Sequence, residues 1–303
     1  DDFRLYDRAL SHEEIRSLYD LSATKLQATQ ENNLTDGLVG YWSFDGQYMD
    51  LGSSTSEVKD SSGQGNHGDW RNHSTTTTMG KIGQAIEFDG VDDSVDLGTS
   101  ADIQLQYPMT ITAWVNMASL PSDAANYYPV ILSRDDEASE RQFSFRFGSV
   151  ADTLEIYIYP NGNSSGYEYF ESGLTIVENE LNTWIFVALT MTSDGIPTLY
   201  KNLSSETGPA FSDLTVPSVT TGTVIGDDSL EVDAYEFPGK IDEVRMYNRV
   251  LSDAEITQLY NMGEGTKINT TQENKQTGGL IGHWSFDGPY MDWGSTTAEV
   301  LDS

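Results

Sequence analysis

The stretch that decides the fold reads GKIDEVRMYNRVLSDAEI and spans residues 239–256. Its first half alternates apolar and polar residues, which is typical of a half-buried strand. Its second half holds Ser252 and Glu255 at the spacing of a capping box, ahead of apolar residues at Ile256 and Leu259. The pattern predicts a strand that leads into one short amphipathic helix.

The residues before this stretch also keep a period of two. Every second side chain is apolar in TITAWVN (110–116), LEIYIY (154–159) and WIFVALTM (184–191). Residues that favour turns separate these segments, for example PNGN at 160–163 and SDG at 193–195. Many strands and one short C-terminal helix predict an all-β fold, a two-sheet antiparallel sandwich.

Two parts of the sequence occur twice. GLVGYWSFDGQYMDLGSSTSEVKDS at residues 37–61 returns at residues 279–303, with 18 of 25 positions identical. Residues 1–20 return at residues 242–261, with 10 of 20 positions identical. The offset of about 242 residues is too long for a solenoid unit and suits one sandwich domain.

The order of these copies predicts the domain layout. Residues 1–22 are expected to be the C-terminal end of a preceding repeat, and residues 38–263 a complete repeat. Residues 279–303 would then start the next repeat, with polar linkers at 23–37 and 264–278 that share the sequence TQEN. We therefore expect a window from a tandem-repeat protein, in which neighbouring repeats are partners.

Composition excludes several classes of function. The chain has 303 residues, 16 Lys and Arg against 48 Asp and Glu, a formal net charge of −32 and no cysteine. A field of that sign repels nucleic acid, and the lack of cysteine excludes disulfides and thiol catalysis. The longest apolar runs, such as WIFVAL, are far shorter than a membrane span, so no membrane insertion is expected.

Four segments together resemble a known family. They are AIEFDGVDDSVDLG (85–98), MTITAWVNM (109–117), NTWIFVALTMTSDGIPTLYKN (182–202) and the stretch at 239–256. In this order they resemble the laminin-G-like, concanavalin A-like jelly-roll domains of bacterial and archaeal surface proteins. The resemblance implies a sandwich of twelve to fourteen strands with a concave and a convex sheet, often a bound calcium, and carbohydrate or protein binding in adhesion. Residues 159–180 depart from the family, because they are longer and more aromatic.

One segment supports an enzymatic alternative. Glu87, Asp89 and Asp92 resemble the catalytic E-x-D-x-x-E strand of retaining glycosidases with this jelly roll, which need two carboxylates about 5 Å apart. The last position is Asp instead of Glu, however, and Gly90 interrupts the strand. We expect instead that Ile86 and Phe88 face the core while the acids face solvent, so no catalytic residue is assigned.

Tyrosines are the candidate ligand-binding residues. Tyr157 and Tyr159 lie on the strand face opposite Leu154, Ile156 and Ile158, and Tyr167, Tyr169 and Phe170 follow soon after. Flat rings with polar neighbours suit sugar binding. Tyr157, Tyr159 and Tyr169 are therefore predicted to bind a ligand, although packing between strands is an alternative explanation.

The acidic residues near the closing strand predict a calcium site. Alternation puts Asp242 on the same face as Val244 and Met246, at the edge of the core, where an unpaired carboxylate is costly. The resemblance brings the first strand, which ends near Asp45, next to this closing strand, and the following loop adds Asp60 and Asn66. Calcium with oxygen ligands from Asp45, Asp60, Asn66 and Asp242 is the prediction. The alternative is that Asp242 accepts backbone N–H bonds or pairs with Lys240.

These observations together predict a non-catalytic binding or adhesion module at the cell surface or outside the cell. A glycan or a surface protein is the expected ligand. The alternatives are a purely structural spacer repeat and a glycan hydrolase or lyase of the same fold.

Overall fold

The protein is described by a computed structural model covering residues 3–10, 33–53, 55–72, 77–122, 128–136, 140–148, 151–227, 235–264 and 280–284. The chain divides into two compact units, one formed by residues 34–265 and the other by residues 1–33 with 266–303. Most residues of the two expected linkers and of the flanking partial repeats lie outside the described residues. The larger unit contains the expected complete repeat at 38–263.

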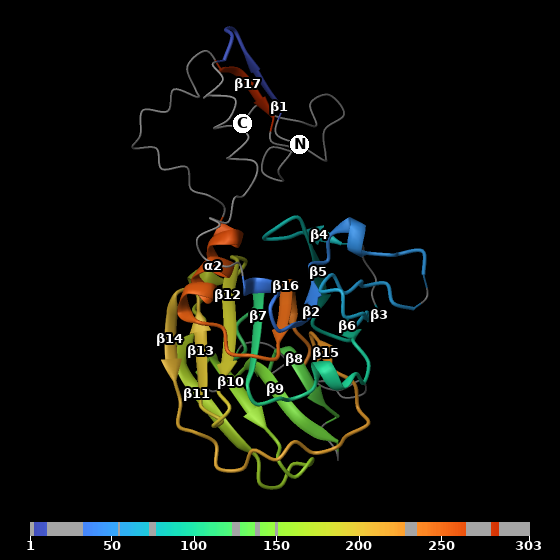
Figure 1. Ribbon diagram of the computed structural model, residues 1–303, viewed down its shortest axis with the longest axis vertical. Coiled ribbons are helices and arrows are strands. Elements are labelled where there is room, and N and C mark those ends of the chain that lie inside the picture. Colours follow the sequence, from blue (N-terminus) through green and yellow to red (C-terminus); the bar gives the residue numbers. More distant parts are fainter. Residues whose placement is uncertain are drawn as a thin grey trace. The chain divides into compact units, whose positions relative to one another are not determined.

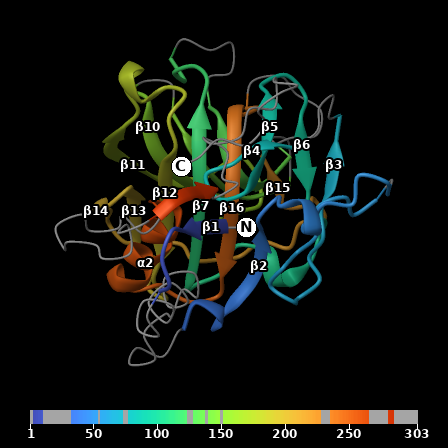
Figure 2. The same cartoon turned by 90° about the horizontal axis from the view of Figure 1, so that it is seen from above.

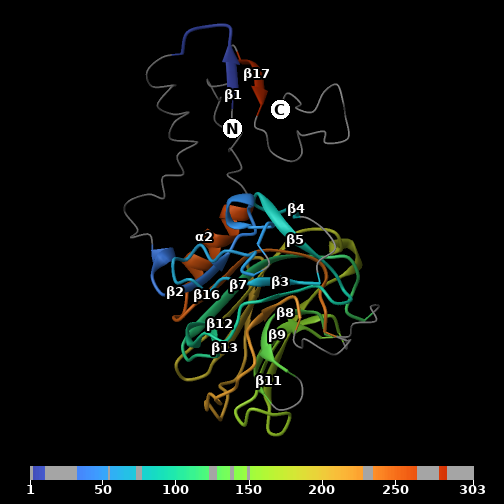
Figure 3. The same cartoon turned by 90° about the vertical axis from the view of Figure 1, so that its right-hand side faces the viewer.

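Two antiparallel sheets form the larger unit, so the predicted all-β sandwich is confirmed (Figures 1 and 3). The seven-stranded sheet has the order β11 (Glu168–Thr175), β10 (Thr153–Ile158), β9 (Arg141–Phe147), β8 (Val130–Asp135), β15 (Val224–Ile225), β6 (Ser94–Asp96) and β3 (Asp69–Arg71). The eight-stranded sheet has the order β14 (Ser204–Thr207), β13 (Pro197–Lys201), β12 (Ile185–Met191), β7 (Met109–Met117), β16 (Pro238–Tyr247), β5 (Gln84–Asp89) and β4 (Thr78–Met79), and β2 (Leu38–Trp42) pairs with β16. Short 3-10 helices lie at Asn33–Thr35, Gly46–Tyr48, Ala101–Ile103 and Glu178–Glu180.

The main core lies between the two sheets. Ile111, Ala113 and Val115 of β7 are fully buried there, as the alternation of the sequence predicted. Every second residue of β10 and β12 contributes in the same way. Burial of such apolar surface contributes about 25 cal/mol per Å² and is the main force that holds the sheets together.

A second, smaller core lies on the outer face of the eight-stranded sheet, under helix α2 (Asp253–Glu264) (Figure 2). Ile256 and Leu259 of the helix are buried, and Tyr260 stacks on Trp114 of β7 with ring centroids 5.6 Å apart. The predicted capping box is present, because the Ser252 N–H donates to Glu255 Oε2 at 2.8 Å and the Glu255 N–H donates to Ser252 Oγ at 3.4 Å. In the described part of the chain, no helix has the length and apolar character needed to cross a membrane.

The smaller unit contains a strand pair that copies one in the larger unit. β1 (Phe3–Tyr6) pairs antiparallel with β17 (Leu280–Trp284), and Phe3 lies opposite Trp284. In the larger unit Val244 of β16 lies opposite Trp42 of β2, which are the corresponding repeat positions. Both pairs also share a register shift one residue before the last partner. The duplicated sequences therefore pair with the same register in both units.

Candidate functional site

Four tyrosines gather on the outer face of β10 and β11, at the edge of the seven-stranded sheet. Tyr157 and Tyr169 are direct cross-strand partners, and their rings stack with centroids 4.9 Å apart and planes 13° apart. Tyr167 lies 5.6 Å from Tyr157 and 6.0 Å from Tyr169, between ring centroids. Tyr159 lies 6.4 Å from Tyr157. We call Tyr157, Tyr159, Tyr167 and Tyr169 the tyrosine surface.

The four rings differ in how much they offer to a ligand. Tyr167 and Tyr169 are each 49% exposed, and Tyr157 is half-buried. Tyr159 is only 3% exposed, which corrects the expectation that it binds a ligand directly. The reason is that Arg141 covers its ring, with Cζ 4.1 Å from the centroid, and donates to its hydroxyl at 2.8 Å. Tyr167 takes the place of Tyr159 as the second exposed ring.

Two arginines support the rings from the neighbouring strand β9. Arg146 Cζ lies 4.1 Å from the Tyr157 ring centroid and 4.5 Å from that of Tyr128, and its Nε lies 3.5 Å from Glu155 Oε2. Arg141 Nε lies 2.7 Å from Asp135 Oδ1. Such stacking of guanidinium on rings is worth about 0.5–2 kcal/mol each. The Tyr157 and Tyr159 rings are therefore held in place before any ligand arrives, which lowers the entropic cost of binding on them.

The surroundings of Tyr157 keep its hydroxyl neutral. Burial, and secondly the charge of Glu155, raise the pKa of Tyr157 to about 12. The hydroxyl therefore stays protonated at neutral pH and can donate as well as accept a hydrogen bond.

Sequence reasoning missed the two arginines and the pair Tyr128 and Tyr235, whose rings stack 5.6 Å apart beside Arg146. A signal for Arg146 existed, since Phe143, Phe145 and Phe147 of β9 alternate into the core and leave Arg146 on the outer face. No local pattern places Tyr128 and Tyr235 together, because they come from segments more than 100 residues apart.

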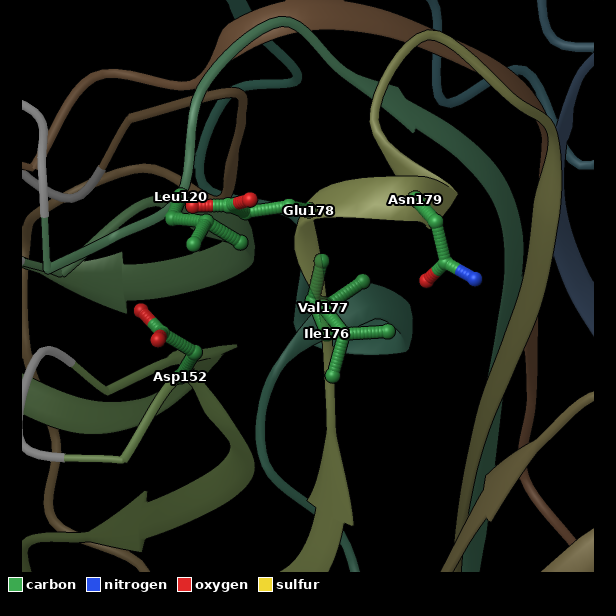
Figure 4. Close-up of a pocket in the computed structure, with 6 residues that line it drawn as sticks. All are labelled: Leu120, Asp152, Ile176, Val177, Glu178 and Asn179. Carbon is green, nitrogen blue, oxygen red and sulfur yellow. The ribbon is translucent and has the colours of Figure 1, made fainter.

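An open pocket of about 670 Å³ is lined by other residues than the four tyrosines, and Figure 4 shows its lining. Leu120, Ile176 and Val177 supply its apolar lining, and Asp152, Glu178 and Asn179 its polar groups. The Asp152 carboxylate already accepts from the Ser122 N–H at 2.8 Å and the Ser122 hydroxyl at 3.0 Å. Among the described residues that line the pocket there is no aromatic ring, so the tyrosine surface is the better platform for a sugar.

The structure places the four predicted calcium ligands in two pairs. Asp60 and Asn66 lie in one loop, where the Asn66 N–H donates to Asp60 Oδ2 at 2.9 Å. The Asp60 carboxylate also accepts from the Tyr41 N–H and from the Ser62 N–H and hydroxyl. The Asn66 amide donates to the Val39 carbonyl at 2.7 Å. These protein contacts account for the burial of Asp60 without a metal.

Asp45 and Asp242 hold the turn between β4 and β5. Asp242 Oδ2 accepts from the Lys81 N–H at 2.8 Å and the Ile82 N–H at 3.0 Å, and Asp45 Oδ1 accepts from the Gln84 N–H at 2.9 Å. A Cβ at Gly80 would lie 2.6 Å from Asp242 Oδ2, so glycine permits this close approach. The observed backbone bonds agree with the alternative explanation for Asp242, and Lys240 Nζ instead lies 3.4 Å from the Thr78 hydroxyl.

These contacts do not fit one calcium ion held by all four residues. Among the described residues, the acidic trio whose ligand oxygens lie within 4.8 Å of one another is Asp89, Asp92 and Asp93, and it includes none of the four. One oxygen of the predicted set, Asp242 Oδ1, is buried and has no hydrogen-bond partner within the described residues. Calcium binding thus stays a proposal that rests on this single oxygen.

The acids of the enzymatic alternative face solvent. Ile86 and Phe88 are buried, whereas Glu87 and Asp89 are exposed on β5, as expected. Asp89 Oδ1 caps the following turn by accepting from the Val91 N–H at 2.8 Å. β5 belongs to the eight-stranded sheet, so these acids and the tyrosine surface lie on different sheets.

The chain belongs to the concanavalin A-like lectin/glucanases superfamily, because a laminin G profile of that description matches residues 89–257, more than half of the chain. The chain is similar to domain 4 of AbnA, an extracellular GH43 arabinanase from Geobacillus stearothermophilus solved with arabinotriose. The TM-score is 0.55 at 19% identity, over 74% of this chain and 98% of that domain.

The chain is also similar in fold to the binding domains of two toxins. The binding domain of Paraclostridial Mosquitocidal Protein 1 gives a TM-score of 0.56 at 15% identity, over 75% of this chain and 52% of that domain. The botulinum neurotoxin serotype D ligand-binding domain solved with N-acetylneuraminic acid gives a TM-score of 0.55 at 15% identity, over 75% of this chain and 51% of that domain. The chain thus spans about half of each toxin domain, and at these identities the likeness concerns the fold. A comparison with curated protein sequences found no match.

Proposed function

We propose that the protein is a non-catalytic module that binds glycans through the tyrosine surface. The observation that carries this proposal is the pair of exposed rings, Tyr167 and Tyr169, which both lie against Tyr157 at the sheet edge: Tyr169 stacks on it, and Tyr167, just before β11, is tilted against it. Sugar rings present flat C–H faces that pack on aromatic rings, and the tyrosine hydroxyls can bond to sugar hydroxyls. An open surface of this kind suits a sugar chain better than a small enclosed metabolite.

The fold supports the same proposal by analogy. The solved domains that resemble this chain include one in complex with arabinotriose and one in complex with N-acetylneuraminic acid. Fold alone does not fix function, and the tyrosine surface supplies the separate, chemical support. The proposal includes a location at the cell surface or outside the cell, within a tandem array of such repeats.

The test is a glycan array probed with the full chain. We compare the parent with a variant carrying Tyr167→Ala and Tyr169→Ala, and with the control Leu203→Ala, which removes an exposed apolar side chain from the β13–β14 turn. We expect the parent and the control to bind the same glycans. The double variant should lose most of that binding at an unchanged melting temperature, since two exposed rings contribute about 1 kcal/mol each or more.

Two outcomes would favour the alternatives. A parent that binds no glycan would favour the structural spacer. Cleavage of laminarin or agarose by the parent, lost on Glu87→Gln with Asp92→Asn, would favour the glycan hydrolase or lyase.

A further inference from the structure

We propose that the tyrosine surface selects uncharged glycans and rejects those that carry carboxylate or sulfate groups. This inference rests on the proposed function and adds the class of ligand to it. Its basis is the state of every cationic side chain in the unit formed by residues 34–265, and the charge of the residues around the rings.

The two cations nearest to the rings are already neutralised. Arg146 is 5% exposed, pairs with Glu155 and has its guanidinium against the rings of Tyr128 and Tyr157. Arg141 is 8% exposed and pairs with Asp135. A ligand carboxylate would have to displace a buried protein carboxylate to reach either guanidinium, which would leave that carboxylate without its partner.

The other cations of this unit are committed elsewhere. Six pair with a carboxylate: Lys59, Arg71, Lys81, Lys201, Arg245 and Arg249. Arg134 donates to the Ser100 and Thr99 carbonyls, and Lys240 lies beside the Thr78 hydroxyl. The positions between 34 and 265 that the structure does not describe hold no Lys or Arg. Arg134 is only 3% exposed and Lys240 lies on β16 of the eight-stranded sheet, so neither presents its charge at the tyrosine surface.

The face of β11 that carries Tyr169 also carries an exposed negative charge. Glu171 is exposed two residues after Tyr169, on the same face of β11, and lies opposite Glu155 of β10. Its Oε1 accepts from the Thr153 hydroxyl at 3.2 Å, which holds the carboxylate in place. Together with the net charge of −32, this carboxylate repels an acidic sugar, whereas an uncharged sugar can use it as a hydrogen-bond acceptor.

The experiment uses the full chain and matched pairs of glycans. Each pair contains a neutral oligosaccharide and its acidic form, for example N-acetyllactosamine with its sialylated form, and xylo-oligosaccharide with its glucuronylated form. We expect the acidic member of any bound pair to bind at least about tenfold more weakly at about 50 mM salt. The difference should shrink at about 500 mM salt, because screening shortens the reach of the repulsion.

A charge reversal tests the role of Glu171. Glu171→Lys should raise affinity for the acidic member severalfold at low salt. Asp194→Lys, which makes the same change of charge in the exposed β12–β13 turn, should raise it less. Equal gains from both variants would mean that net charge alone decides and would overturn the local role of Glu171.

The failures of the two proposals are distinguishable. Equal or stronger binding of the acidic member by the parent would overturn the selection for uncharged glycans and leave glycan binding intact. An array on which neither member of any pair binds would overturn the proposed function and this inference with it.

Discussion

The carboxyl group of Asp242 is fully buried beside the β4–β5 turn. Burial, together with the charges of Glu243 and Asp45, raises the pKa of Asp242 well above its ordinary value of 3.8, although the N–H groups of Ile82 and Lys81 oppose this. A carboxyl with a raised pKa binds its proton more tightly in the folded state than in the unfolded chain. Its contribution to stability is complete below the unfolded pKa and is lost as the pH rises through the folded pKa.

We therefore predict that Asp242→Asn removes the loss of folding stability that the parent suffers as the pH rises. The amide keeps an acceptor for the Lys81 and Ile82 N–H groups but does not titrate. The melting temperature of the variant minus that of the parent should increase as the pH rises from about 4 to about 8. The measurement is thermal unfolding in EDTA. Asp194→Asn, in an exposed turn, serves as the control and should show no such trend.

If calcium bound at Asp242, the pKa of this carboxyl would be lowered and not raised, because a bound cation favours the charged carboxylate. In that case, calcium at 100 times its Kd would stabilise the parent by about 2.7 kcal/mol, and the variant would not respond. A difference that stays flat with pH in EDTA, together with this calcium response, would contradict the buried neutral carboxyl. It would support the calcium proposal.

At the residue scale, the sequence predicted the face on which a side chain lies better than the side chains that it contacts. Alternation placed Tyr157 on the outer face and Ile156 in the core, and both placements hold. It could not predict that Arg141 would cover Tyr159, because that contact needs the register between β9 and β10. In the same way, the proximity of Asp242 to Lys81 depends on a turn 161 residues away in the chain.

At the scale of elements, helix α2 packs on Trp114 of strand β7 through the Tyr260 ring and through a glycine, Gly263. A Cβ at Gly263 would lie 2.4 Å from Cε2 and Cζ2 of the Trp114 indole, closer than packed atoms approach. Gly263 therefore lets the last turn of the helix rest on the ring.

We predict that Gly263→Ala destabilises the protein although alanine favours helix. The gain in helix propensity is about 1 kcal/mol, whereas overpacking a filled core costs about 1–3 kcal/mol. Thermal unfolding should show a net loss, with a melting temperature lower by a few degrees. Asn261→Ala, at an exposed site of the same helix, is the control and should be neutral or slightly stabilising. A more stable Gly263→Ala would mean that α2 can shift away from Trp114 at little cost.

The predicted elements with a strong period all form, including β7, β10, β12 and the capped helix. The order of strands within each sheet had no local signal. β8 lies between β9 and β15 through contacts that join residues near 132 to residues near 225. Turn residues mark where a strand ends, but they do not state which strand it will join.

At the scale of the whole molecule, the unit formed by residues 34–265 has its own core and both of its sheets. We predict that a fragment of these residues folds alone. Its melting temperature should lie within about 2 °C of the main transition of the full chain, which for a domain of this size means less than about 1 kcal/mol. Calorimetry of both proteins checks this. A fragment that unfolds at a clearly lower temperature would show that the repeat boundaries predicted from the sequence are misplaced.

The pairing of β2 with β16 has a mechanical consequence for this unit. Leu38, at the start of β2, lies opposite Tyr247, at the end of β16, so the chain enters and leaves this strand pair at the same end. Two hydrogen bonds close that end: the Asn248 N–H donates to the Gly37 carbonyl, and Arg249 Nε donates to the Asp36 carbonyl. Tension that reaches this end of the pair would load these bonds first and then separate the two strands one pair at a time, like a zipper. The strands would not have to slide past each other with all their bonds resisting together, so in this direction the unit is a compliant element that yields gradually under load.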